Sequence, residues 1–228
     1  MLIVIEGLDG SGKSTQVAKI KNYLASKCNG RVKYLHFPRF DAPVIGDMIS
    51  GFLRGDFGSI TSVHPKIVAY LFAQDRRDAS DMMKRWLDDG EVVLLDRYVY
   101  SNIAFQCAKL SRNEQANELA EWIRKSEYEI FDIPRPDINI FLDVPVSFVD
   151  SRLSEHRGGD DREYLKGKND IHEADMDFQR KVREVYLDCC ASDSSFIRVD
   201  CSDSKGNMMP AQDIFEKIRT VIEGLWAL

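Results

Sequence analysis

The sequence predicts an α/β fold in which a five-stranded parallel sheet is flanked by helices. Five short apolar runs alternate with longer stretches of helical periodicity, as in successive βαβ units. Runs that lack polar alternation are typical of strands buried on both faces. The expected strands are residues 2–5, 32–37, 92–95, 138–142 and 196–199.

Local start and stop signals predict six helices. A proline suits the first turn of a helix and a glycine its exit, which places a long helix between Pro65 and Gly90. The Asn29-Gly30 pair closes the first helix. The expected helices cover residues 13–26, 65–89, 114–131, 146–155, 170–191 and 210–226.

One stretch breaks this pattern. Residues 156–162 (HRGGDDR) are polar and charged and contain two adjacent glycines, which is typical of a mobile loop. We therefore expect a mobile lid around residues 155–168, between two helices. The sequence contains no internal repeat or interdomain linker, so residues 1–228 should form a single domain that includes the lid.

Charge and hydropathy exclude several classes of function. The chain of 228 residues carries a formal net charge of −6, whereas a surface for nucleic acid or an anionic membrane normally shows a basic stripe. No apolar stretch approaches the roughly 20 residues that span a bilayer, and Met1 leads directly into a strand. We expect a cytoplasmic protein with neither nucleic-acid nor membrane partners.

The cysteines and histidines argue against a disulfide framework or a zinc site. The five cysteines are odd in number and contain no C-x-x-C pair. The four histidines lie far apart, without the spacing of metal ligands. We expect reduced thiols.

The strongest chemical signal follows the first expected strand. Residues 7–14 (GLDGSGKS) fit the phosphate-binding pattern G-x-x-x-x-G-K-[ST]. Small residues let several backbone N–H groups converge on phosphate oxygens, and the next helix points its positive dipole end at the same anion. Lys13 should reach the outer phosphates, and the Ser14 hydroxyl should bind magnesium. The alternative is a glycine-rich turn without a ligand. The expected nucleotide-binding residues are Gly7, Asp9, Gly10, Ser11, Gly12, Lys13, Ser14 and Thr15.

A second signal is a carboxylate at the end of the third expected strand. Asp96 closes an apolar run, where the second metal-positioning group of a P-loop enzyme belongs. Asp143, after residues 138–142, is the competing candidate. We favour Asp96 because the adjacent Arg97 offers a partner for a second phosphate-bearing substrate, while Asp143 could satisfy neighbouring backbone or arginine donors.

Phosphoryl transfer needs charge neutralisation on both sides of the moving group. Arg39, Arg76 and Arg97 could form the acceptor side, because they follow strands or lie on a helix near the expected carboxyl edge of the sheet. Each could instead be a solvated surface arginine.

Several separated motifs together resemble the thymidylate kinase family over nearly the whole chain. They are residues 5–15 (IEGLDGSGKST), 36–40 (HFPRF), 71–76 (LFAQDR), 96–99 (DRYV), 101–102 (SN) and 137–145 (DINIFLDVP). The resemblance implies a P-loop nucleoside monophosphate kinase fold, transfer of the γ-phosphoryl group of ATP to dTMP with Mg²⁺, and a homodimer.

The same resemblance implies roles for matching residues. Phe72 would stack on thymine, and Arg76 and Asn102 would bind the base. Pro38 would pack against the 5-methyl group, and Phe105 would crowd a ribose 2′-hydroxyl. Arg97, Arg39 and Asp9 would bind the acceptor sugar or its phosphate. Ser14, Asp96 and Asp9 would bind the metal. From the residues alone, an aromatic residue such as Phe72 on a helix is more often a core residue than a platform for a base.

Two positions depart from the family pattern. Some thymidylate kinases carry an arginine inside the P-loop where this chain has Gly10, so the extra cation should come from Arg152, Arg157 or Arg162. Arg157 is the first choice because two glycines follow it. The expected catalytic residues are Lys13, Asp9, Asp96, Arg97, Arg157 and Arg152. Many members have a glutamate where this chain aligns His172, followed by Glu173, and neither residue is assigned a role.

Three other functions fit a P-loop protein. A deoxynucleoside kinase needs a general base more than acceptor-phosphate arginines, so Arg39 and Arg97 argue against it. A guanine-nucleotide switch would place D-x-x-G after the third strand, whereas Asp96 is followed by Arg-Tyr-Val. A noncatalytic scaffold is disfavoured by the intact Lys13 and Ser14.

Overall fold

The computed structural model describes residues 1–111, 114–154, 160–168, 170–173 and 175–226, and the statements below refer to these residues. Its centre is a parallel sheet with the strand order β2-β3-β1-β4-β5. The strands are β1 (Leu2–Gly7), β2 (Val32–His36), β3 (Val92–Asp96), β4 (Ile138–Asp143) and β5 (Phe196–Asp200). All five expected strands are thus confirmed, with boundaries that move by two residues at most.

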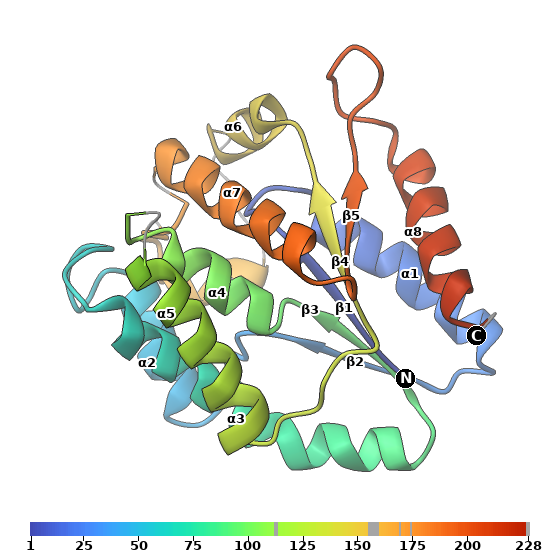
Figure 1. Cartoon of the computed structure of the whole chain (residues 1–228), viewed down its shortest axis with the longest axis horizontal. Helices are drawn as coiled ribbons and strands as arrows, with labels where there is room; N and C mark the ends of the chain where they lie inside the picture. The colour runs from blue at the N-terminus through green and yellow to red at the C-terminus, as the bar shows by residue number, and fades with distance from the viewer. Residues whose placement is uncertain (112–113, 155–159, 169, 174, 227–228) are drawn as a thin grey trace.

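Helices cover both faces of the sheet (Figure 1). One face carries α1 (Lys13–Lys27) and α8 (Ala211–Trp226), and the other carries α3 (Pro65–Asp88), α4 (Val99–Cys107) and α7 (Met176–Ser192). On that second side α5 (Glu114–Arg124) lies outside α4, and α2 (Ile45–Leu53) lies beside α3. The short helix α6 (Val146–Ser154) follows β4.

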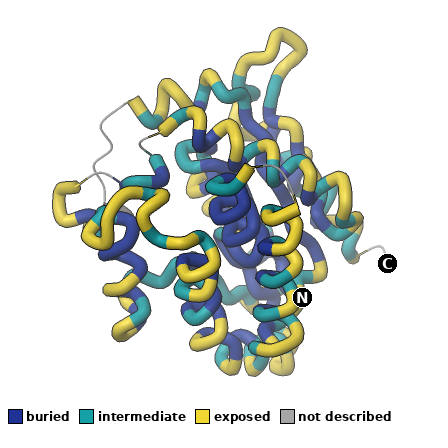
Figure 2. The backbone as a smooth tube through the Cα atoms, turned by 60° about the vertical axis from the view of Figure 1, so that its left-hand side comes forward, coloured by how far each residue is buried: buried dark blue, intermediate teal, exposed yellow. Residues whose placement is uncertain are grey.

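The core lies in the sheet and on the inner helix faces (Figure 2). Every residue of β1, β3 and β4 is buried, which explains why these strands appear as continuous apolar runs. Two helices, α2 and α4, were not expected. All nine residues of α4 are buried, so no face of this helix is exposed to solvent and its sequence lacks the amphipathic pattern of a surface helix.

Three expected segments differ from the structure in a boundary or in helix type. The helix expected over 170–191 begins at Met176, because the Asp175 carboxylate caps it by accepting from the N–H groups of Asp177 and Phe178. The helix expected over 114–131 changes after Arg124 into the π-helix η1 (Lys125–Ile130). The lid, expected as a loop, contains the 3₁₀ helix η2 (Asp160–Leu165).

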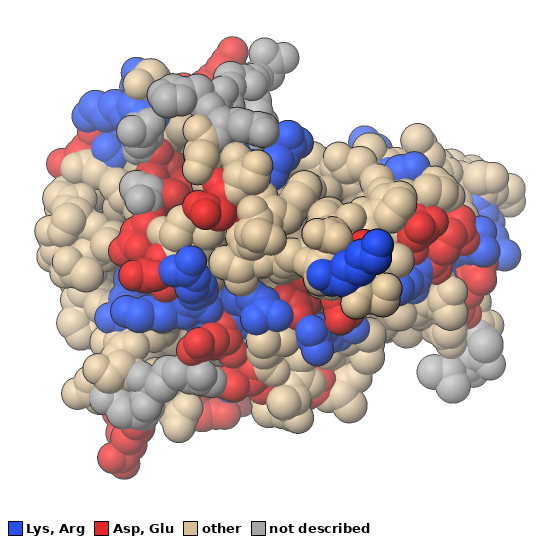
Figure 3. Space-filling model, turned by 90° about the horizontal axis from the view of Figure 1, so that it is seen from above, with Lys and Arg blue, Asp and Glu red and all other residues tan. Residues whose placement is uncertain are grey.

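The cysteines, the hydropathy of the helices and the surface charge can also be compared with the expectations. All five cysteines lie in the described part, and all are free thiols. No helix among the described residues is both long and apolar enough to cross a membrane. Basic and acidic side chains lie interspersed on the face seen in Figure 3. Arg157 lies outside the described residues.

Candidate active site

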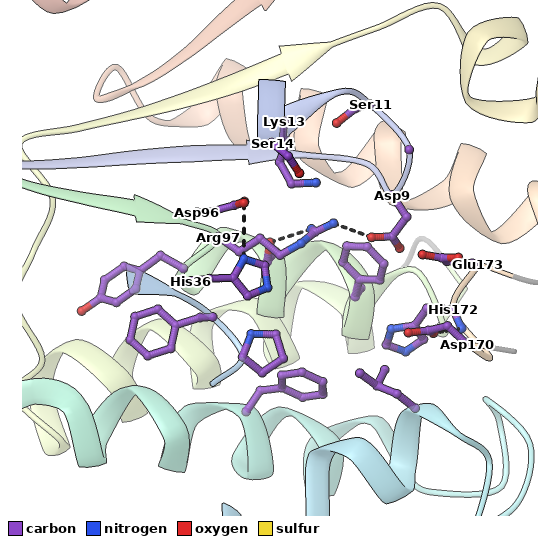
Figure 4. A pocket seen from close by; sticks show the side chains of 18 of the residues that line it. Asp9, Ser11, Lys13, Ser14, His36, Asp96, Arg97, Asp170, His172 and Glu173 are labelled. Atoms are coloured by element: carbon purple, nitrogen blue, oxygen red, sulfur yellow. Dashed lines mark hydrogen bonds and ion pairs between the residues drawn. The ribbon is translucent and has the colours of Figure 1, made fainter. Parts of the chain in front are cut away.

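A cleft of about 610 Å³ opens where the loops after β1, β2 and β3 meet α3 and α4. Parallel sheets place ligands at this carboxyl edge. Most of the predicted site residues line it, and Figure 4 shows Lys13, Ser14, Asp96, Arg97 and Asp9 around one space. Its predicted residues are Asp9, Gly10, Ser11, Gly12, Lys13, Ser14, Thr15, Pro38, Phe72, Arg76, Asp96, Arg97, Asn102, Phe105 and Arg152.

The P-loop has the backbone of an anion cradle. Gly10 and Gly12 adopt left-handed φ angles of 76° and 80°, which side-chain-bearing residues rarely adopt. A Cβ at Gly7 would lie 2.8 Å from the Ser11 Oγ, so this position has room only for glycine unless that side chain moves. Helix α1 has no side-chain cap in the described part of the chain. An anion in the loop would satisfy its first N–H groups.

Lys13 supplies a fixed positive charge at this cradle. Its side chain is buried, and the ammonium donates to the carbonyl oxygens of Leu8 at 2.9 Å and Gly7 at 3.3 Å. Burial, assisted by the nearby Arg97 guanidinium, lowers the pKa of Lys13 to about 8. The group therefore remains mostly protonated at pH 7.

Asp96 lies at the end of β3, facing the P-loop. Its Oδ2 lies 3.3 Å from the Nδ1 of His36, and its buried Oδ1 has no hydrogen-bond partner among the described residues. Burial acts to raise the pKa of Asp96, but the His36 bond and the Lys13 charge outweigh it and hold the pKa below its usual range. The residue is therefore an anion with one oxygen left to bind a ligand.

The competing candidate Asp143 is engaged elsewhere. Its carboxylate accepts from Arg183 at 2.6 Å and 2.9 Å and from Arg198 at 2.7 Å. It is not among the described residues that line the cleft. Asp143 therefore joins β4 to α7 and β5.

Arg97 and Asp9 join the segment after β3 to the P-loop. The Arg97 Nη2 lies 2.5 Å from the Asp9 Oδ1, its Nη1 donates to the Ser101 Oγ at 3.1 Å, and its guanidinium lies 5.2 Å from the centre of the Phe105 ring. Arg97 has a left-handed φ of 68°, an uncommon conformation that clusters at functional sites. These contacts fix the guanidinium at the mouth of the cleft.

Apolar and hydrogen-bonding side chains of α3 and α4 line another part of the cleft. Phe72 lies on α3 and packs edge-on against Phe52. Arg76, one turn further, forms a buried two-bond pair with Glu127 of η1. The Asn102 Nδ2 donates to the Ala69 carbonyl and to Glu127, both at 2.9 Å, while its buried Oδ1 has no partner within the described structure.

The structure does not bring the Arg39 side chain into the cleft. Pro38 and Phe40 belong to the described lining residues, but Arg39 does not. Its guanidinium binds the carboxylates of Asp75 and Asp78 at 2.8 Å and 2.7 Å. The resemblance expected Arg39 to hold the acceptor phosphate, and this role stays a prediction.

Residues 170–173 form the far wall of the cleft, where Asp170, His172 and Glu173 lie beside Asp9 (Figure 4). Burial and the nearby Asp9 carboxylate raise the pKa of Asp170 to about 7. Burial and the positive charges of Lys109 and Arg97 lower the pKa of His172 well below 6.5, so its imidazole is neutral at pH 7.

The comparison with known protein families decides the identity of the chain. The model of the family described as thymidylate kinase matches residues 5–211. The chain belongs to the thymidylate kinase family. Over 192 residues it is 35% identical to a thymidylate kinase of Mycobacterium tuberculosis, which covers 84% of this chain and 86% of that protein. A probable thymidylate kinase of Pyrobaculum aerophilum is 32% identical over 226 residues, 96% of this chain and 97% of that protein.

Solved structures agree with this assignment. The chain matches a thymidylate kinase from Candida albicans with a TM-score of 0.70 and 26% identity, covering 98% of this chain and 91% of that one. A thymidylate kinase from Ehrlichia chaffeensis has a TM-score of 0.64 at 19% identity, covering 97% and 98%. The second likeness supports the P-loop nucleoside monophosphate kinase fold alone.

Sequence reasoning missed several polar residues that shape this thymidylate kinase site. Glu6 on β1 is fully buried, and its carboxylate accepts from the N–H groups of Tyr98 and Ser101 at 2.9 Å and 3.1 Å. An acidic residue within an apolar strand was the available signal. The sequence around Glu127 and Asp170 contains no such signal, because their importance depends on partners distant in sequence.

Proposed function

We infer that this thymidylate kinase transfers the γ-phosphoryl group of ATP to the phosphate of dTMP, giving dTDP and ADP. One observation carries the choice of base. The unpaired Asn102 Oδ1 accepts hydrogen bonds, and the Arg76 guanidinium donates them, in the same cleft as Phe72. Thymine offers the complementary pair, an N3–H donor beside a carbonyl acceptor. Cytosine offers an N3 acceptor and an amino donor, which repel both groups.

The orientation of the Asn102 amide is determined by its surroundings. Its Nδ2 donates to the Ala69 carbonyl and the Glu127 carboxylate, and both partners accept hydrogen bonds. A flipped amide would point its oxygen at two acceptors. The acceptor atom therefore remains available to the base.

The reaction forms a bond from a dTMP phosphate oxygen to the γ-phosphorus and breaks the bond from that phosphorus to the β–γ bridging oxygen. We propose that Lys13 and the P-loop N–H groups hold the donor phosphates, and that Arg97 holds the acceptor phosphate. Both cations lie in one cleft, so each would neutralise charge on one side of the moving group.

We propose Mg²⁺ as the metal of this site. The unpaired, buried Oδ1 of Asp96 and the Ser14 hydroxyl are oxygen ligands of the kind that Mg²⁺ prefers. Among the described residues, no cluster of three or more His, Cys, Asp or Glu could hold a metal by itself. When bound, Mg²⁺ would supply positive charge that neutralises the donor phosphates. Asp96, Ser14 and Asp9 would hold it.

The lid and the assembly complete the proposal. We propose that a lid near residues 155–168 closes over ATP and that Arg157 or Arg152 reaches the transferring group, in a single domain over residues 1–228. Arg152 already lines the cleft. We also propose a cytoplasmic homodimer with no nucleic-acid or membrane partner. The exposed apolar side chains of Ile67 and Tyr70 on α3 and of Ile130 support a self-associating face.

An ADP-release assay with a panel of acceptors tests the function. We expect dTMP to be the best substrate, with dUMP detectable because one methyl group is worth roughly 1 to 3 kcal/mol. Purine monophosphates should fail by size and dCMP by hydrogen-bond mismatch. Equal turnover of dGMP or dAMP would refute the assignment of the base pocket, and thymidine as the best acceptor would indicate a deoxynucleoside kinase. GTP binding without any turnover would indicate a switch.

A further inference from the structure

Behind the cleft, the amide of Gln179 bridges two of its walls. The residue lies on α7, is fully buried and is not among the described lining residues. Its Nε2 donates to the Asp9 Oδ2 at 3.1 Å and to the His172 carbonyl at 2.9 Å. The P-loop and the segment that follows the lid are thereby joined by one side chain.

Burial of the Gln179 amide costs folding stability, which indicates that its polar groups serve the site. The Gln179 Oε1 is buried and has no hydrogen-bond partner in the described part of the molecule, and an unsatisfied buried acceptor destabilises a fold. A methionine of similar length would fill the same space without that cost. The amide gains only the two bonds to Asp9 and His172.

Those bonds determine the orientation of Asp9. One Asp9 oxygen accepts from Gln179 and the other lies 2.5 Å from the Arg97 Nη2. The carboxylate is thus held at both oxygens, and a continuous chain of contacts runs from His172 through Gln179 and Asp9 to Arg97. Displacement of residues 170–173 would release one anchor of the group that fixes Arg97.

We propose that Gln179 is a positioning residue for the acceptor side, which holds Asp9 and through it Arg97 when the segment after the lid is docked. This inference rests on the proposed function. It predicts that loss of the amide impairs the use of dTMP more than the binding of ATP, because Asp96 and Ser14 would still hold the metal. Gln179 itself touches neither substrate.

The test compares Gln179→Met with Gln16→Met. Gln16 is also a buried glutamine that donates one bond to a carbonyl, that of Ala211 at 3.0 Å, and has an unpaired Oε1. We expect Gln179→Met to lower kcat/KM for dTMP by about 10- to 100-fold, as for a lost bond to a charged group. The KM for ATP should change less than the kcat/KM for dTMP, and Gln16→Met should retain the wild-type kcat/KM for dTMP.

A double-mutant cycle with Asp9→Asn separates positioning from a general loss of structure. If Gln179 acts through Asp9, the double variant should be no worse than Asp9→Asn alone. Independent, multiplying losses would overturn the inference, as would a wild-type kcat/KM in Gln179→Met or an equal loss in Gln16→Met. Gln179→Leu replaces Gln179→Met if the latter does not fold. An inactive wild type would refute the proposed function as well, whereas an active wild type with an unimpaired variant refutes the inference alone.

Discussion

Arg76 and Glu127 are 51 positions apart in the chain, yet their side chains form a buried pair with N–O distances of 2.5 Å and 2.7 Å. Because Glu127 also accepts from Asn102 at 2.9 Å, one carboxylate orients both groups proposed to bind the base. The π-helix η1 carries this carboxylate, and π-helical turns occur frequently at functional sites.

Removal of Glu127 should therefore be costly. Glu127→Ala leaves the Arg76 charge buried and unpaired, so we expect a loss of about 3–5 kcal/mol in the free energy of unfolding. Urea denaturation measures it. Asp132→Ala is the matched control, because it breaks the exposed Lys84–Asp132 pair, which should contribute at most about 1 kcal/mol. Equal losses in the two variants would contradict this role of the pair.

Lys13→Ala should abolish turnover and preserve the fold. The ammonium donates only to carbonyls of its own loop among the described residues, while its charge is expected on the transferring phosphoryl group. Steady-state kinetics with circular dichroism tests this. Lys19→Ala, which removes an exposed amine bound to Gln212, should behave as wild type. Near-normal kcat in folded Lys13→Ala protein would refute the role.

Phe72→Ala should raise the KM for dTMP far more than the KM for ATP. Loss of an aromatic platform costs roughly 1–3 kcal/mol per stacked base. The control is Phe57→Ala, because Phe57 is exposed and absent from the described lining of the cleft. An unchanged KM for dTMP would make Phe72 a core residue that packs on Phe52.

The lid should supply a catalytic cation. At position 10 the P-loop carries a glycine instead of an arginine, and an arginine delivered to the transition state is worth roughly 10³- to 10⁵-fold in rate. Arg157→Ala should lower kcat steeply with little change in either nucleotide affinity. Single-turnover kinetics of alanine variants at Arg152, Arg157 and Arg162 identifies the residue. Wild-type rates in all three would exclude a lid cation.

Asp170→Asn should make stability less dependent on pH. The folded pKa is about 7, against a usual value of 3.8, because burial and the nearby Asp9 disfavour the charged form. Ionisation therefore costs stability as the pH rises from about 4 to about 7, and the full cost is present above that range. The variant should be more stable than wild type at pH 8, by at most about 4 kcal/mol, and equally stable near pH 4. Denaturation at both pH values measures the difference. A variant less stable than wild type at pH 8 would contradict it.

Local motifs predicted the parts of the site that local chain geometry builds. The P-loop and the Asp96-Arg97 pair follow strands directly, and both line the cleft. A position next to lining residues does not place a side chain in the cleft. Arg39 lies between two lining residues, yet its side chain pairs with Asp75 of α3. Gln179 could not be predicted, because it meets Asp9 across 170 positions of chain.

In the fold, too, features set by the local sequence could be predicted and features set by tertiary contacts could not. Strands buried on both faces have a sequence pattern that needs no knowledge of their neighbours. Helix α4 is buried on every side, so only its tertiary surroundings distinguish it from a strand or a loop. Boundaries failed where a cap overrode the apolar period, as at Asp175.

Asp143 never meets the cleft, yet Arg183 binds it from one helical turn beyond Gln179 on α7. We expect a variant at Asp143 to loosen α7, the helix that carries Gln179, without removing any described residue that lines the cleft. Such a variant should impair the use of dTMP, an effect that its distance from the cleft would not predict.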